Sequence, residues 1–337
     1  FGTFLPKVTP TITANQHYHT PKSIVKHLNM NATKRRILLD LELLIIDEVS
    51  MLRADLLDAI DMVLRYIRKN NAGFGGVQVL FIGDLHQLPP VVKNDEWNLL
   101  SQFYKSAFFF DALALAQNQP LYIELEKIYR QADDTFIHLL NNLRNNQVTD
   151  QDIALLKTYY KENYQPDLTE NYITLTTHNN KADTLNKNSL KELDGKSYFY
   201  NAIVDKDFAE SAYPVEKTLE LKVGAQVMFV KNDPTGEQRF FNGKIAVVKK
   251  LSDEAIEVLP DGARYNLILD KFTWKNIKYT TNKTTNEIEE EVAGTFTQFP
   301  LKLAWAITVH KSQGLTFDKA IIDIGDAFAP GQIYVAL

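Results

Sequence analysis

The chain has 337 residues, of which 45% are hydrophobic and 23% are charged, and its formal net charge is −5. This length predicts two or three domains of a globular protein. The absence of cysteine excludes disulfide scaffolds, thiolate zinc sites, iron–sulfur clusters and cysteine nucleophiles. No apolar run approaches the roughly 20 residues of a membrane helix, and the first residues resemble neither a signal nor a transit peptide. A mildly acidic chain can still grip nucleic acid through one locally basic groove.

The first distinctive segment is basic. Residues 22–36 hold Lys22, Lys26, Lys34, Arg35 and Arg36 and no acidic residue. Two interpretations stay open, because a basic run is either a solvated loop or helix, or a contact to nucleic acid.

A strand–helix–strand unit follows. Residues 41–46 form a short Leu/Ile-rich run that is typical of a buried parallel strand, and residues 77–82 form a second one. Between them, residues 51–70 carry apolar side chains at helical spacing. This order predicts a right-handed crossover unit of an α/β domain. Polar residues follow both strands, and open parallel sheets bind ligands at that edge.

The alternation of predicted strands and helices then continues. The sequence predicts a strand at 121–125 and, over 172–180, a strand that runs into a polar turn. It predicts helices at 133–145, 150–160 and 181–192, with Asp150 as a helix cap.

Residues 196–294 differ, because short strands alternate with turns there in an all-β, barrel-like pattern. The α/β pattern resumes afterwards. We therefore expect a first α/β domain over 1–118, a second over 119–195 plus 295–337, and an inserted β module over 196–294.

Two motifs carry the clearest chemistry. The segment LLIIDEVSM (43–51) ends a buried strand with Asp47, which can hold Mg²⁺, and Glu48, which can orient and polarise an attacking water. The segment IGDLHQLPP (82–90) ends the next strand. There Gly83 permits a tight turn, Asp84 can tie the loop down, and the uncharged Gln87 can bond a γ-phosphate or its water. The plain alternatives are two solvated acids at a strand end and an ordinary proline-stopped loop.

Together these segments resemble motifs II and III of superfamily 1 DNA helicases of the PIF (petite integration frequency) and RecD type. Further segments resemble the same family in the same order over nearly the whole chain: ELEKIYRQ (124–131), FIHLLNNLRNN (136–146), LTTHNNKADTLN (175–186), ITVHKSQGLTFD (307–318) and IYVAL (333–337). The resemblance implies two RecA-like parallel-sheet motor domains and an SH3-like inserted module. By the same resemblance, residues 22–36 of this chain would correspond to a small wedge that splits the duplex.

The resemblance also implies roles for single residues. Arg130 matches a γ-phosphate arginine, which would join Glu48 and Gln87 as a catalytic group. Asp47, Gly83, Asp84 and Gly314 would lie at the nucleotide, with Asp47 on the metal. The implied DNA contacts are Thr176, His178, Asn179, Thr308, His310, Lys311, Ser312, Lys34, Arg35 and Arg36.

One departure matters for activity. No G-x-x-x-x-G-K-[ST] phosphate loop occurs in the sequence. In the family that loop lies upstream of the position matching Phe1, and a further arginine would follow Leu337. We therefore expect an excised segment that starts after the phosphate loop, ends within motif VI and hydrolyses little ATP alone.

The implied function is the motor portion of an ATP-dependent 5′-to-3′ DNA helicase that uses ATP and Mg²⁺. Its partners would be single-stranded and forked DNA without a membrane, and it would act as a monomer. Repair, recombination and telomere maintenance are the implied processes, and cytoplasm or nucleoid (nucleus or mitochondrion in a eukaryote) the implied location. The alternatives are a RecD-like subunit of a recombination nuclease complex and a catalytically inactive DNA-binding scaffold fragment.

Overall fold

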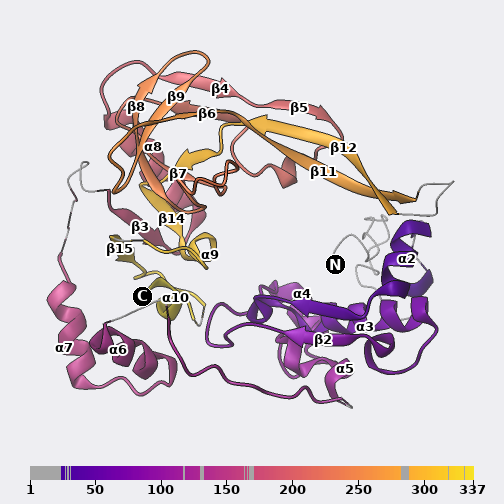
Figure 1. Cartoon of the computed structure of the whole chain (residues 1–337). Helices are drawn as coiled ribbons and strands as arrows, with labels where there is room; N and C mark the ends of the chain where they lie inside the picture. The colour runs from indigo at the N-terminus through magenta and orange to yellow at the C-terminus, as the bar shows by residue number, and fades with distance from the viewer. Residues whose placement is uncertain are drawn as a thin grey trace. The chain divides into compact units, whose positions relative to one another are not determined.

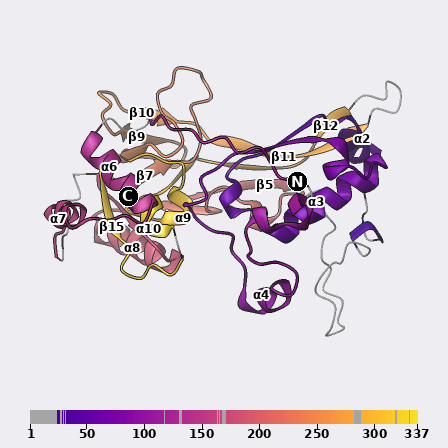
Figure 2. The ribbon, with the colours of Figure 1, turned by 90° about the horizontal axis from the view of Figure 1, so that it is seen from below.

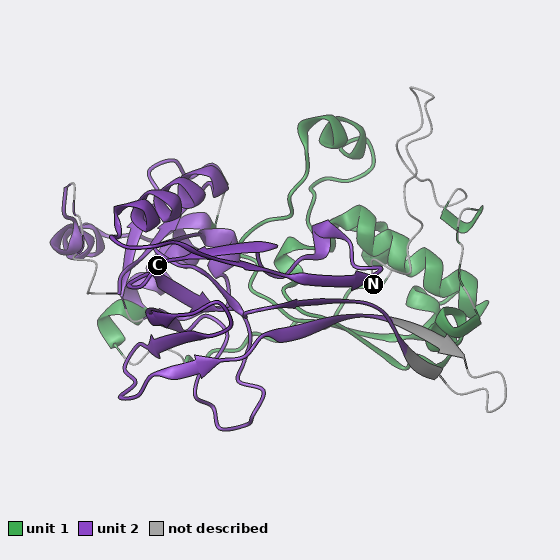
Figure 3. Ribbon diagram, turned by 90° about the horizontal axis from the view of Figure 1, so that it is seen from above, with its two compact units in different colours: residues 1–137, 279–289, 329–331 green, residues 138–278, 290–328, 332–337 purple. Residues whose placement is uncertain are grey.

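The computed structural model describes residues 24–26, 28, 30, 32–116, 118–129, 133–162, 164, 166, 171–281, 288–317, 319–329 and 331–337. The chain divides into two compact units (Figure 3). Unit 1 comprises residues 1–137, 279–289 and 329–331, and unit 2 comprises residues 138–278, 290–328 and 332–337. No helix in the part of the chain described is long and apolar enough to cross a membrane.

The core of unit 1 is the predicted strand–helix–strand element. Strand β1 (Leu43–Ile46) pairs in parallel with β2 (Gln78–Phe81), and helix α3 (Ala54–Arg68) connects them. The helix buries one apolar face, because its buried residues recur every three or four positions. The crossover unit predicted from the sequence is thus confirmed. The other short elements of this unit are η1 (Val49–Met51), η2 (Gly73–Gly76), α4 (Asn94–Leu100), η3 (Phe109–Asp111) and α5 (Leu113–Ala116).

Helix α2 (Ala32–Asp40) is attached to this core through Arg68. The Arg68 guanidinium donates from Nη1 to the carbonyls of Leu38, Leu39 and Leu41 at 2.9, 2.6 and 3.0 Å. These carbonyls lie at the end of α2, where the last turn lacks partners within the helix. The Arg68 side chain therefore holds α2, the helix that carries Lys34, Arg35 and Arg36, against the core of unit 1. Helix α4 buries none of its residues and projects from the unit (Figure 2).

Residues 121–129 correct one prediction. The strand expected at 121–125 is absent, since this segment lies in neither helix nor strand. Leu121 and Leu125 are 88% and 86% exposed. A strand needs a neighbour on which to pack and pair, and β propensity without one does not fold the segment. Helices α6 (Asp134–Arg144) and α7 (Asp150–Tyr159) follow as predicted. The cap of α7 is Thr149, not Asp150, because the Thr149 side chain accepts from the Asp152 N–H.

The second parallel sheet has the order β14-β3-β15. Its strands are β3 (Ile173–Thr176), β14 (Ala306–Thr308) and β15 (Ala320–Asp323), all parallel, so the α/β class is confirmed. Helix α8 (Asn179–Glu192) packs beside β14, and its Asn186 side chain bonds the Ala306 N–H and C=O at 2.9 and 2.8 Å. Short helices α9 (Val309–Ser312) and α10 (Gln332–Ala336) complete this part of unit 2.

The residues between α8 and β14 form an all-β region, as the sequence predicts. This holds for the described residues 198–281 and 288–303, apart from the short turn η4 (Glu210–Ala212). One antiparallel sheet has the order β10-β9-β8-β7-β13, with two smaller sheets, β11-β12-β5 and β4-β6 (Figure 1). The bounds are β4 (Tyr198–Asn201), β5 (Ile203–Lys206), β6 (Thr218–Leu221), β7 (Gln226–Phe229), β8 (Ile245–Leu251), β9 (Ile256–Pro260), β10 (Leu267–Leu269), β11 (Phe272–Thr281), β12 (Ile288–Gln298) and β13 (Leu301–Leu303). The SH3-like assignment and the domain boundaries stay predictions.

A buried amide joins the β module to the parallel sheet. Gln226 on β7 is 2% exposed, and its Nε2 donates to the carbonyls of Tyr172 and Ala304 at 2.7 and 2.8 Å. These carbonyls precede β3 and β14. Because leaving such a buried group unpaired is costly, the contact holds the module in register with the strands that end at the candidate DNA site.

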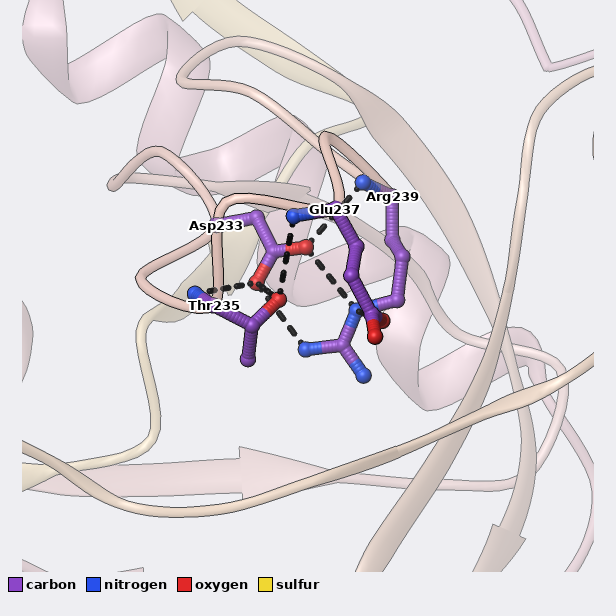
Figure 4. Close-up of polar contacts among 4 residues, drawn as sticks. All are labelled: Asp233, Thr235, Glu237 and Arg239. Atoms are coloured by element: carbon purple, nitrogen blue, oxygen red, sulfur yellow. Dashed lines mark hydrogen bonds and ion pairs between the residues drawn. The ribbon is translucent and has the colours of Figure 1, made fainter.

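The loop between β7 and β8 is organised by Asp233 (Figure 4). Its side chain is 1% exposed and accepts hydrogen bonds from Arg239 Nε and Nη2 at 2.8 and 2.9 Å, from Thr235 Oγ1 at 2.8 Å, and from the N–H groups of Thr235 and Arg239, both at 3.1 Å. These bonds favour the charged carboxylate, and the pKa of Asp233 lies well below its usual value, with the Arg239 contact as the largest cause.

We predict that Asp233→Asn destabilises the protein by about 2 kcal/mol, because charge-assisted bonds to a buried acceptor are lost. A depressed folded-state pKa gives stability that is present above the unfolded pKa of about 4 and is lost as the pH falls toward the folded value. The difference between wild type and variant should therefore shrink below about pH 4. Urea unfolding at pH 7 and pH 3.5 measures it. Glu237→Gln, at a side chain 69% exposed, is the control. Equal differences at both pH values would contradict the assignment.

Candidate nucleotide and nucleic-acid sites

The motif that contains Asp47 and Glu48 and the motif that contains Gln87 lie at the same sheet edge of unit 1. Ile46 pairs with Phe81 at the ends of β1 and β2, and beyond this pair the Val49 N–H donates to the Ile82 carbonyl at 3.0 Å. Gly83 touches the same turn, because a Cβ atom on it would lie 2.9 Å from the Val49 nitrogen. The close approach thus requires glycine at position 83. The structure therefore brings the segments 47–51 and 82–88 together.

Asp47 and Glu48 occupy a sharp turn that faces solvent. Glu48 has left-handed backbone angles (φ 51°, ψ 45°), and its N–H donates to Asp47 Oδ1 at 2.9 Å. The chain then enters η1, whose Val49 is 3% exposed. A non-glycine residue in this conformation is uncommon and is tolerated where surrounding contacts fix it. Here the buried Val49 and its bond to β2 fix it, so the turn presents both carboxylates at the edge.

Gln87 lies on a loop that Asp84 organises. The His86 N–H donates to Asp84 Oδ1 at 3.0 Å, and the Gln87 N–H donates to the Asp84 carbonyl at 3.1 Å. The next residue, Leu88, is completely buried. These contacts give the Gln87 backbone a defined position on the loop whose first residues, Ile82 and Gly83, touch Val49.

The residues fit a magnesium ion that a nucleotide helps to hold. Within the described ranges there is no group of three His, Cys, Asp or Glu side chains suited to a metal. Mg²⁺ is commonly bound by one or two carboxylates plus substrate phosphates and water, and Asp47 offers one carboxylate at an exposed turn. A backbone phosphate cradle would have to come from elsewhere, because the sequence contains no phosphate loop. Arg130 lies outside the described residues.

The DNA-contact candidates of unit 2 gather at the carboxyl edge of β14-β3-β15, but the structure divides them. Thr176, Thr308 and Ser312 are buried, with 0, 3 and 6% exposure. Ser312 Oγ donates back to the Val309 carbonyl at 2.9 Å. These three hydroxyls are buried in this structure, and their roles as DNA contacts stay predictions. The residues that follow the strands are exposed or half-buried: His178, Asn179, His310, Lys311 and Gly314.

The exposed part of this edge is aromatic and cationic. Thr177 Oγ1 lies 2.7 Å from His178 Nδ1. Burial lowers the pKa of His310 below its usual value, which favours the neutral imidazole. Burial and then the charge of Lys311 lower the pKa of Lys302 to about 8. The sequence analysis missed Phe328, whose ring centroid lies 5.2 Å from that of His178 and 6.2 Å from that of His310.

Lys34, Arg35 and Arg36 all lie on α2, and Arg35 and Arg36 are exposed. Arg36 pairs with Asp40 one turn later at 3.5 Å, with both side chains more than half exposed. Such a pair contributes little to stability. The described part of the basic segment is therefore a solvated helical surface, which leaves both interpretations of it open.

Comparison with known proteins points to one family. The model of the PIF1-like helicase family matches residues 14–153. Human ATP-dependent DNA helicase PIF1 is 34% identical over 303 residues, which cover 89% of this chain and 44% of the human protein. The chain spans about half the length of the curated relatives it matches.

This chain covers a larger share of similar solved structures than of the curated relatives. Bacteroides sp. Pif1 in complex with ADP-AlF4 has a TM-score of 0.82 and 42% identity, covering 96% of this chain and 72% of that one. Bacteroides Pif1 bound to single-stranded DNA has a TM-score of 0.63 and 41% identity, covering 98% and 73%. Fold and matches together define a superfamily 1 helicase-type α/β protein. More narrowly, the chain belongs to the PIF1-like helicase family.

We predict that Gly83→Ala destabilises unit 1 by about 1–3 kcal/mol, because the added Cβ would overlap the Val49 backbone rather than a movable side chain. Thermal unfolding followed by circular dichroism should show a melting temperature lowered by several degrees. Gly325→Ala is the matched control, since a Cβ there meets nothing within 4 Å. Equal melting temperatures for the two variants would contradict the close packing of the two loops.

Proposed function

We propose that the full-length protein is an ATP-dependent DNA helicase that moves 5′ to 3′ on single-stranded DNA and unwinds duplexes. The observation that supports this most directly is the joining of the Asp47-Glu48 turn to the Gln87 loop by the Val49–Ile82 hydrogen bond. This arrangement suits the metal-and-water half of a nucleotide site. A Bacteroides relative was solved with ADP-AlF4 and another with single-stranded DNA, which supports both ligands for this chain.

In this proposal each motif residue has one task. Asp47 holds Mg²⁺, which neutralises charge on the phosphates when the nucleotide is bound. Glu48 accepts a proton from the attacking water, and Gln87 orients that water by hydrogen bonding. Arg130 approaches the γ-phosphate, where an arginine is worth about 10³–10⁵ in rate. Gly83 and Asp84 hold the Gln87 loop in place.

The proposed DNA contacts are the accessible polar groups at the edge of β14-β3-β15. His178, Asn179, His310 and Lys311 can donate to sugar and phosphate, and Gly314, with φ +76° and open space around it, lets the backbone approach. Such contacts bind DNA without distinguishing its base sequence. Lys34, Arg35 and Arg36 on α2 are the proposed contacts at a fork.

The sheet of unit 1 supports the proposal that further parts of the full-length protein complete the nucleotide site. One face of β1 and β2 is exposed, with Leu43, Ile45, Leu80 and Ile82 between 43 and 56% accessible. Parallel sheets are normally covered on both faces. A segment that carries the phosphate loop would find a complementary apolar surface there.

We predict that Glu48→Gln in the full-length protein preserves ATP binding and lowers DNA-stimulated hydrolysis by about 10²–10⁴, since it keeps the side-chain shape and removes the base. Arg130→Ala should lower hydrolysis by about 10³–10⁵. A phosphate-release assay with single-stranded DNA measures both. Glu42→Gln, an exposed acid just before β1, is the control and should hydrolyse normally. No hydrolysis by the wild type would favour the inactive scaffold instead.

We also predict that the chain binds single-stranded DNA without strong base-sequence preference and with an affinity that falls as salt rises. Lys311→Ala should weaken binding and reduce the slope of log affinity against log salt by about one. Fluorescence anisotropy with labelled oligonucleotides at several salt concentrations measures this. Lys249→Ala, at an exposed position on β8, should leave the slope unchanged. An affinity indifferent to salt would exclude phosphate-dominated binding.

A further inference from the structure

Three strands place three aromatic rings at one sheet edge. His178 follows β3, His310 lies on α9 directly after β14, and Phe328 lies on the loop after β15, elements that Figure 1 shows close together. The ring centroid of Phe328 is 5.2 Å from His178 and 6.2 Å from His310, and its plane is within 17° of the His310 plane. These segments are far apart in sequence, so only the parallel sheet brings the rings together.

The loop that carries Phe328 is held at several points. Lys181 on α8 pairs with Asp323 at 2.8 Å and with Asp326 at 3.7 Å. The Ala327 N–H donates to the Ile324 carbonyl at 2.9 Å, and the Phe328 N–H donates to Oε1 of the fully buried Gln332 at 3.0 Å. Phe328 therefore has a defined backbone position, although its side chain is 65% exposed.

An exposed phenyl ring fixed in this way lies among groups suited to a polynucleotide. Lys311 and Asn179, which follow His310 and His178 in the sequence, are exposed donors for phosphate oxygens. The His310 ring adds a second flat surface almost parallel to the phenyl ring. Proteins that bind single strands without sequence preference combine phosphate donors with aromatic side chains on which bases stack, because every base has a π face.

We propose that Phe328, flanked by His178 and His310, is a base-stacking residue for single-stranded DNA. This inference rests on the proposed DNA-binding function and adds a base contact to its phosphate contacts. The contact with the base requires an aromatic ring, and an aliphatic side chain does not replace it. Loss of one stacked base corresponds to a weakening of about tenfold.

The test compares two probes of equal length: a fluorescent oligothymidylate, and an oligonucleotide of abasic residues that keeps the phosphates and lacks the bases. Anisotropy titrations use the full-length protein and its Phe328→Leu, Phe328→Ala and Phe328→Tyr variants. Phe103→Ala, which removes a ring of nearly equal exposure (63%) in unit 1, is the matched control. Thermal unfolding verifies that each variant is folded.

We expect Phe328→Leu and Phe328→Ala to bind oligothymidylate about tenfold more weakly and the abasic probe as the wild type does. Phe328→Tyr and Phe103→Ala should bind both normally. Equal weakening on both probes would overturn the stacking role and leave Phe328 with only a positioning role, and unchanged binding would overturn any role. If Phe328→Ala unfolds, the folded leucine and tyrosine variants decide. A wild type that binds neither probe would contradict the proposed DNA-binding function itself.

Discussion

The single hydrogen bond from the Val49 N–H to the Ile82 carbonyl is the constraint on which the candidate nucleotide site depends. It extends the pairing of β1 and β2 by one step beyond the strands. Glu48 must then turn through a left-handed conformation, and position 83 must lack a side chain. The strain at Glu48 and the glycine at 83 are therefore two results of one cause, which is that both chain segments leave the same sheet edge in close contact.

In unit 2 the strands also end at one sheet edge, but the hydroxyl side chains at their ends are buried, whereas the carboxylates of unit 1 are exposed. Thr176 and Thr308 are buried where their strands end, and Ser312 bonds within α9. Threonine is favoured in strands for its β-branched shape, so its presence there follows from packing alone. The groups that can reach a ligand are the ones just beyond, on the cap and first turns of α8 and α9. The Asn186 and Gln226 side chains bond backbone groups at the opposite, amino ends of β3 and β14.

Local patterns in the sequence predicted most of this fold, because the strands 43–46 and 78–81 and the helix between them are determined by their own apolar spacing. The prediction failed where the outcome depended on a partner. Residues 121–125 have strand-like side chains but pair with no strand among the described residues. Thr149 rather than Asp150 caps α7, because Asp152 completes a reciprocal pair with Thr149. Phe328 could not be found from sequence, since its neighbours come from two distant segments. The positions of Asp47 and Glu48 were predictable because they directly follow β1, and that of Gln87 because it lies on the loop after β2.

Electrostatics explains how a chain of net charge −5 can offer a surface to a polyanion. Lys302 on β13 is half-buried, and its pKa falls to about 8 through that burial and through the charge of Lys311 on α9. Two cations held close together by the fold repel each other, so a phosphate beside them would relieve the repulsion and raise the pKa of Lys302 again. In the proposed function, this coupling makes phosphate binding and protonation of Lys302 support each other. The affinity of the site is then set by local geometry and not by the net charge of the molecule.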